Sequence, residues 1–166
     1  MYLVHQTETE YIKNIFNDKL LKSGNKTNNK GYNPHNYYLE HVYFTTIPRK
    51  HLHKVKGTIT LVFNKNILLH HDFYINNHFR GQILEDTEKY NTYDTNKIHE
   101  ILYQIYNKNK NKIIEYSDYQ KSHEIFIKKD VTLDLLKYII IEYDNPERNF
   151  IENKISKYPH LELIIR

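Results

Sequence analysis

Short apolar segments of strand length recur along almost the whole chain, and they restrict its fold more than any other feature. Within residues 58–63, Ile59, Leu61 and Phe63 alternate with the residues between them, which is the period of a β-strand with one buried face. Another strand is predicted to begin at Leu3 and Val4. Further strands are predicted at 42–45, 113–116, 123–127, 138–143 and 161–165.

Helical patterns are fewer than strand patterns, and the first directly follows the first strand. Thr7 and Glu10 have the spacing of a capping box, which marks the start of a helix. Apolar residues then recur every three or four positions, so we expect a helix over residues 8–22 that ends at Gly24. Two further helices are predicted, one from Asp94 or Thr95 through Ile98, Ile101, Leu102 and Ile105, and one from Pro146 to Lys157. Early helices with strands throughout predict an α+β fold.

The segments between these elements are polar and rich in Asn and Lys. We expect a polar loop at 25–36, a short helical turn at 48–54, a turn at 64–66 leading into 67–70, an irregular stretch at 72–91 and a solvated loop at 107–112. No internal repeat and no linker divides the chain. Because 166 residues are enough to bury a substantial core, we expect a single domain over residues 1–166.

The composition excludes several classes of site. The chain has no Cys, which rules out disulfides, thiolate zinc sites and a cysteine nucleophile. Its net charge of +4 permits an anionic partner, but no dense basic stripe requires one. No apolar run approaches the roughly 20 residues of a membrane span, and the N-terminus lacks the order of a signal peptide. We therefore expect a soluble, intracellular protein. The absence of Ala beside abundant Asn, Lys, Ile and Tyr fits an AT-rich genome, such as that of a large DNA virus.

Three of the strand segments carry the residues with the most informative chemistry. His5, Tyr43 and Glu124 each stand among apolar neighbours in a predicted strand. A glycosidic bond to nicotinamide breaks through an oxocarbenium-like transition state, which a carboxylate stabilises electrostatically. A tyrosine offers a flat face for the nicotinamide ring, and a histidine can bond a ribose hydroxyl. If the three side chains converge on one cleft, they would form a nicotinamide-dinucleotide site.

The order and surroundings of these residues resemble the ADP-ribosyltransferase fold, specifically its His-Tyr-Glu branch, to which the poly(ADP-ribose) polymerases belong. His5-Gln6-Thr7 fits the family's His-x-Ser/Thr motif, and Tyr43-Phe44 fits its Tyr-Phe strand. Glu124-Ile125-Phe126-Ile127 fits the strand that opens with the family's glutamate. The resemblance implies an α+β domain with a split β-sheet or β-sandwich core and peripheral helices.

The same resemblance implies a function and a role for each residue. The chain would be an NAD-dependent ADP-ribosyltransferase, with NAD as co-substrate, nicotinamide as a product, and a protein or nucleic acid as acceptor. His5 and Thr7 would hold the riboses or the amide of NAD, Tyr43 would pack against nicotinamide, and Glu124 would be catalytic.

The sequence also departs from this family at several positions. Ser122 stands where the arginine-specific branch has an acidic or amide residue, which argues against arginine as the acceptor. The second tyrosine cluster of the polymerases is missing after Thr45. Replacements for that nicotinamide clamp are Tyr37, Tyr38 and Phe73. Arg49 and Arg80 offer the basic residues with which a related RNA 2′-phosphotransferase takes a phosphate.

Plain structural explanations compete with each of these roles. His5 can be a satisfied histidine in an apolar strand, Thr7 is explained by helix capping, and Tyr43 is one of 16 tyrosines. Glu124 can be an exposed strand start. The functional alternatives are a non-catalytic module that binds nucleic acid or protein on the same fold, an NAD glycohydrolase and an RNA 2′-phosphotransferase.

A metal site is disfavoured despite 11 histidines. His51 and His53, like the adjacent His70 and His71 with Asp72, do not have the spacing that aligns ligands on a helix face, and adjacent strand residues point to opposite faces.

Overall fold

The computed structural model describes residues 2–23, 26, 41–45, 58–76, 87–90 and 124–166. Within these residues the chain forms a mixed sheet with the strand order β10-β9-β4-β1-β3-β7-β5-β6, together with a two-stranded sheet of β2 and β8. The strands are β1 (Tyr2–Glu8), β2 (Leu20–Leu21), β3 (His41–Thr45), β4 (Thr58–Asn64), β5 (Phe73–Asn76), β6 (Thr87–Tyr90), β7 (Glu124–Lys128), β8 (Val131–Thr132), β9 (Leu136–Ile141) and β10 (Glu162–Ile165). The α-helices are α1 (Ile12–Asp18) and α3 (Arg148–Ile155), and 3-10 helices cover Thr9–Tyr11, Lys65–Leu69 and Leu133–Leu135.

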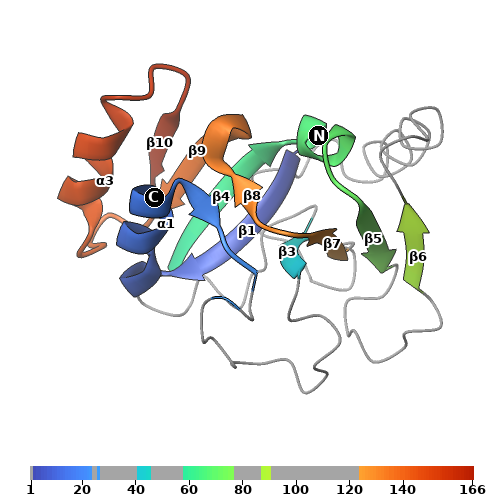
Figure 1. The fold of residues 1–166 in the computed structure, drawn as a ribbon. Helices are drawn as coiled ribbons and strands as arrows, with labels where there is room; N and C mark the ends of the chain where they lie inside the picture. The colour runs from blue at the N-terminus through green and yellow to red at the C-terminus, as the bar shows by residue number, and fades with distance from the viewer. Residues whose placement is uncertain (1, 24–25, 27–40, 46–57, 77–86, 91–123) are drawn as a thin grey trace.

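Figure 1 shows α1 and α3 near the end of the sheet that holds β9 and β10, whereas β5 and β6 form the other edge. Strand β4 lies between β1 and β9, with antiparallel pairing to both. Its residues Thr58 to Phe63 are all buried, so it is covered on both faces and not on one face only. Among the described residues no helix is long and apolar enough to cross a membrane.

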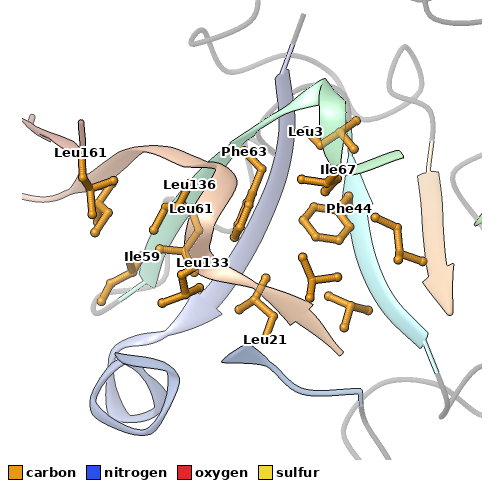
Figure 2. Packing of buried hydrophobic residues seen from close by; sticks show 14 of the residues in the cluster. Leu3, Leu21, Phe44, Ile59, Leu61, Phe63, Ile67, Leu133, Leu136 and Leu161 are labelled. Carbon is orange, nitrogen blue, oxygen red and sulfur yellow. The ribbon is translucent and has the colours of Figure 1, made fainter. Parts of the chain in front are cut away.

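One apolar cluster fills the space between the sheet and the elements that cover it. Phe63 and Leu61 of β4 contribute from the sheet, and Phe44 contributes from β3. Leu21 of β2 and Leu133 close the cluster from the other side (Figure 2). All five side chains are at most 8% exposed, so burial of apolar area here is a main source of stability.

Most strand predictions are confirmed within one or two residues. The segments predicted at 42–45, 58–63, 123–127, 138–143 and 161–165 correspond to β3, β4, β7, β9 and β10. The helix predicted from Pro146 is also present, as α3. These elements carry the strongest apolar patterns in the chain.

The prediction for the first helix is wrong at both ends. Thr7 is not a cap, because β1 continues through Glu8 and Thr7 pairs with Ile59 of β4. The first helical turn, Thr9–Tyr11, has no side-chain cap bond. Helix α1 ends at Asp18, since Lys19 adopts the left-handed conformation with φ of 56°. The chain then enters β2, whose pairing with β8 stops the helix well before Gly24.

One further prediction fails in the middle of the chain. The chain does turn after β4 as expected, and it does so in a 3-10 helix over 65–69, with Asn64 Oδ1 accepting a hydrogen bond from the Asn66 N–H at 2.9 Å. The stretch 72–91 was expected to be irregular, yet it contains β5 and β6, which pair with each other and extend the sheet from β7. The remaining predictions lie outside the described residues: the helix from Asp94 or Thr95, the strand at 113–116, the turn at 48–54, the loop at 107–112 and nearly all of the loop at 25–36.

Candidate active site

The three segments that carry His5, Tyr43 and Glu124 form neighbouring strands of the sheet. They are β1, β3 and β7, which follow one another in the sheet order. Strands β3 and β7 pair over five positions, from His41↔Lys128 to Thr45↔Glu124. The fold therefore brings together segments that are far apart in the sequence.

The boundary between β1 and β3 is the weakest part of this ladder. β1 pairs with β4 over seven positions but with β3 at a single position, Val4↔Thr45. Thr45 has a register partner on each side of β3, because it also pairs with Glu124 of β7. Its hydroxyl donates a long hydrogen bond of 3.5 Å to the Val4 carbonyl. We call this boundary the β1–β3 junction.

His5 crosses this junction with its side chain. Its Nδ1 lies 2.8 Å from the Tyr43 carbonyl oxygen, and its ring centroid lies 5.8 Å from that of Phe44. A carbonyl oxygen only accepts hydrogen bonds, so Nδ1 must carry the proton. In the neutral imidazole, Nε2 is then the acceptor nitrogen. This tautomer suits a ring that receives a hydrogen bond from a hydroxyl group.

Tyr43 directs its side chain to the other face of the sheet. Its half-buried ring packs edge-on against Phe126, with centroids 5.0 Å apart, whereas His5 lies on the face of Phe44. Successive residues of a strand alternate between faces, which separates Tyr43 from Phe44. The side chains of His5 and Tyr43 therefore do not share one face of the sheet. These two residues meet through the Tyr43 backbone carbonyl.

Glu124 begins β7 and has Thr45 and Asn76 as its register partners. Tyr43↔Phe126 is the next pair on the same face of the β3–β7 ladder. Register thus puts positions 43 and 124 on one face, and it puts His5 and Thr7, two residues apart in β1, on the other. Thr7 is half-buried, and its hydroxyl donates to the Glu8 carbonyl at 3.5 Å.

The structure also bears on the secondary candidates. Phe73 is completely buried in the core, so it is not available to clamp nicotinamide. Within the described residues, no three His, Asp or Glu side chains gather in a way that could hold a metal ion. Tyr37, Tyr38, Arg49, His51, His53, Arg80 and Ser122 lie outside the described part of the chain.

Sequence reasoning did not single out Thr45 as a site residue. Its register with both Val4 and Glu124 makes it the common neighbour of β1 and β7. The signal available in the sequence is its position two residues after Tyr43, which predicts the same face of the strand. Recognising its importance also requires the strand order, which the sequence does not specify.

Comparison with known proteins finds similar structures but no matching family. No family model and no curated protein matches the chain. The structure of Thermus sp. 2.9 DarT in complex with NAD+ matches with a TM-score of 0.65 at 12% identity, covering 99% of this chain and 94% of that one. The same protein in complex with ADP-ribosylated ssDNA matches with a TM-score of 0.64 at 12% identity, covering 99% and 93%. Thermosipho africanus DarTG in complex with ADP-ribose matches with a TM-score of 0.57 at 10% identity, covering 99% of this chain and 49% of that one.

These likenesses concern the fold. The chain has the α+β fold of the DarT structures, and the predicted fold class is confirmed. The assignment to the His-Tyr-Glu branch and the roles of His5, Thr7, Tyr43 and Glu124 stay predictions.

Proposed function

We propose that this protein is an ADP-ribosyltransferase of the His-Tyr-Glu type, which uses NAD as co-substrate and transfers ADP-ribose to a nucleic acid. The observation that carries the proposal is the likeness over almost the full length to DarT structures solved with NAD+ and with ADP-ribosylated ssDNA. Single-stranded DNA is therefore the first acceptor to test. An intracellular location and a viral source rest on composition alone.

The proposed reaction assigns one task to each candidate residue. The bond between the nicotinamide nitrogen and ribose C1′ breaks, and neutral nicotinamide leaves with the bonding electrons. The Glu124 carboxylate stabilises the positive charge that develops on the ribose. A nucleophilic atom of the acceptor then attacks C1′ and gives up its proton, which the Glu124 carboxylate accepts.

The other residues would orient the co-substrate. The His5–Tyr43 hydrogen bond supports Nε2 as the acceptor for a ribose hydroxyl, because it fixes the tautomer. Thr7 shares the face of His5 and supplies a hydroxyl to the same part of NAD. Tyr43 shares the face of position 124 and presents its ring to nicotinamide. Because the register puts these two groups on opposite faces of the sheet, the four roles together require NAD to contact both faces at the β1–β3 junction.

Substitution of Glu124 tests the assignment. Glu124→Gln should keep NAD binding, measured by calorimetry, and lower nicotinamide release by about a hundredfold or more. Glu162→Gln is the matched control, because Glu162 is an exposed glutamate that also begins a strand. Absence of NAD binding by the wild type at millimolar concentration would overturn the proposed function, and unchanged release by the Gln variant would remove Glu124 from the reaction.

Analysis of the products separates the alternatives. ADP-ribose linked to DNA identifies the transferase, and free ADP-ribose as the only product identifies an NAD glycohydrolase. DNA binding with a steep salt dependence but no nicotinamide release identifies a non-catalytic module on the same fold.

A further inference from the structure

Four basic residues gather where β7 ends and β5 begins. Lys128 ends β7 and Lys129 follows it, while His70 and His71 precede Asp72 and the start of β5. The two segments are joined because the Lys128 backbone N–H donates a hydrogen bond of 3.1 Å to the Asp72 carbonyl. Lys128, Lys129 and His70 are exposed, and His71 is half-buried. We call these four residues the basic cluster.

The charge of the basic cluster is poorly compensated. The acidic residue of the β7–β8 turn, Asp130, already accepts a hydrogen bond of 2.8 Å from Lys26 and another from the Ser23 backbone. Within the described residues neither Lys128 nor Lys129 has an ion pair, and the exposed Asp72 directly follows the two histidines. Burial lowers the pKa of His71, and the neighbouring His70 and Lys129 lower it further against the opposing effect of Asp72. His71 therefore offers a phosphate a hydrogen bond, and Lys128 and Lys129 supply the positive charge of the cluster.

The backbone holds Lys129 in a conformation that favours glycine. Its φ is 77°, in the left-handed region that costs a residue with a Cβ roughly 1–2 kcal/mol. The turn therefore fixes the backbone from which the Lys129 side chain extends into solvent. It also provides a way to remove this charge without harm to the fold, because glycine fits the same turn.

The position of the basic cluster relative to Glu124 indicates its ligand. Glu124 and Lys128 are the two ends of β7, and positions 124 and 128 lie on the same face of that strand. Four strand residues span about 13 Å, a distance that a nucleic-acid backbone covers within a few nucleotides. A nucleic acid whose acceptor base lies at Glu124 can therefore place backbone phosphates at Lys128 and Lys129.

We propose that the basic cluster binds the phosphates of the acceptor nucleic acid and so holds the strand while its acceptor base is presented to Glu124. This inference rests on the proposed function, because it takes the acceptor to be a nucleic acid. Phosphates of NAD share the same chemistry. We assign the cluster to the nucleic acid because its basic groups are distributed over two exposed segments, which suits a ligand with repeated phosphates.

The test measures binding of a fluorescent single-stranded oligonucleotide in the absence of NAD. Lys128→Ala/Lys129→Ala should weaken binding on the order of tenfold at low salt and reduce the slope of log affinity against log salt by about 1.4, since each phosphate contact contributes about 0.7. Lys129→Gly alone should reduce the slope by about 0.7 and keep the denaturation midpoint. Lys137→Ala/Lys157→Ala removes the same charge from β9 and the segment after α3 and should leave the slope unchanged.

Nicotinamide release without DNA separates this inference from the proposed function. The Lys128→Ala/Lys129→Ala variant should release nicotinamide in water at the wild-type rate and with the wild-type KM for NAD. A raised KM with unchanged DNA affinity would assign the cluster to the phosphates of NAD and overturn the inference. An unchanged salt slope, or an equal loss in the control pair, would overturn it as well. If wild type releases no nicotinamide, the proposed function fails, but the DNA measurements still decide whether the cluster binds phosphates.

Discussion

Within each half of the main sheet, neighbouring strands pair over four or more positions, whereas the two halves meet at a single register pair. In the half formed by β10, β9, β4 and β1, neighbouring strands share long ladders, including seven register pairs between β1 and β4. A buried hydrogen bond of 3.1 Å from the Asn145 amide to the Thr9 hydroxyl also ties the end of β1 to the segment before α3. The half formed by β3, β7, β5 and β6 meets β1 through one register pair. Side chains therefore carry much of the connection between the halves.

Side-chain contacts from several described residues make that connection. His5 bonds the Tyr43 carbonyl, Thr45 bonds the Val4 carbonyl, and the rings of Phe44 and Phe63 meet edge-on with centroids 5.5 Å apart. Two of these contacts involve residues next to or within the candidate site. Because side chains make this connection, single substitutions can alter it one contact at a time. Their effects on stability and on nicotinamide release can then be measured separately.

The largest effect is expected from the buried core. Leu61→Ala removes a completely buried side chain of β4, and the lost contacts and the cavity should lower the free energy of unfolding by about 2–5 kcal/mol. Ile125→Ala does the same in β7, whose Ile125 is also completely buried. Since one apolar cluster contains both residues, urea denaturation should show a single transition for both variants. A second transition in Ile125→Ala alone would show that the halves unfold separately.

Strands β4 and β9 were predictable from sequence, and so were β3 and β7, whereas β5 and β6 were not. Leu61 belongs to an alternating apolar pattern and Ile139 to an apolar run, and these patterns identified β4 and β9. Strand β5 was missed because Phe73, Tyr74 and Ile75 form a run too short to stand out between His, Asp and Asn. Strand β6 has a largely polar sequence and gains its place by pairing with β5.

The site was predictable as a set of segments but not as a geometry. The residues around His5, Tyr43 and Glu124 identified three strands that do become neighbours. The face that each side chain takes depends on the register between strands, and Val4↔Thr45 cannot be read from sequence. The capping box at Thr7 failed for a related reason, because pairing with β4 continues the strand through the position where a helix would begin.

His5 provides the next test, with a smaller effect on stability. His5→Phe removes the hydrogen bond to Tyr43 and should lower the free energy of unfolding by about 0.5–1.5 kcal/mol. His5→Asn retains a donor near the Nδ1 position and should recover part of this loss. If Nε2 orients NAD as proposed, neither variant recovers nicotinamide release. Full release by His5→Asn would instead limit His5 to joining β1 and β3.

The smallest effect on stability is expected at Asp130, which accepts hydrogen bonds from Ser23 and Lys26 beside the two-stranded sheet. Burial works to raise the pKa of Asp130, but hydrogen bonds from Lys26 and Ser23 outweigh it and hold the pKa below its ordinary value. Because the folded pKa is lower than the unfolded one, the carboxylate stabilises the fold above a pH of about 3.9. That stabilisation is lost as the pH falls through the folded pKa. Asp130→Asn should thus lower the free energy of unfolding at pH 7 by up to about 1 kcal/mol, and the difference from wild type should disappear in strong acid. Asp134→Asn, at an exposed carboxylate nearby, is the control and should change stability less at pH 7. If the difference persisted in strong acid, the effect of Asp130 would come from packing and not from its ion pair with Lys26.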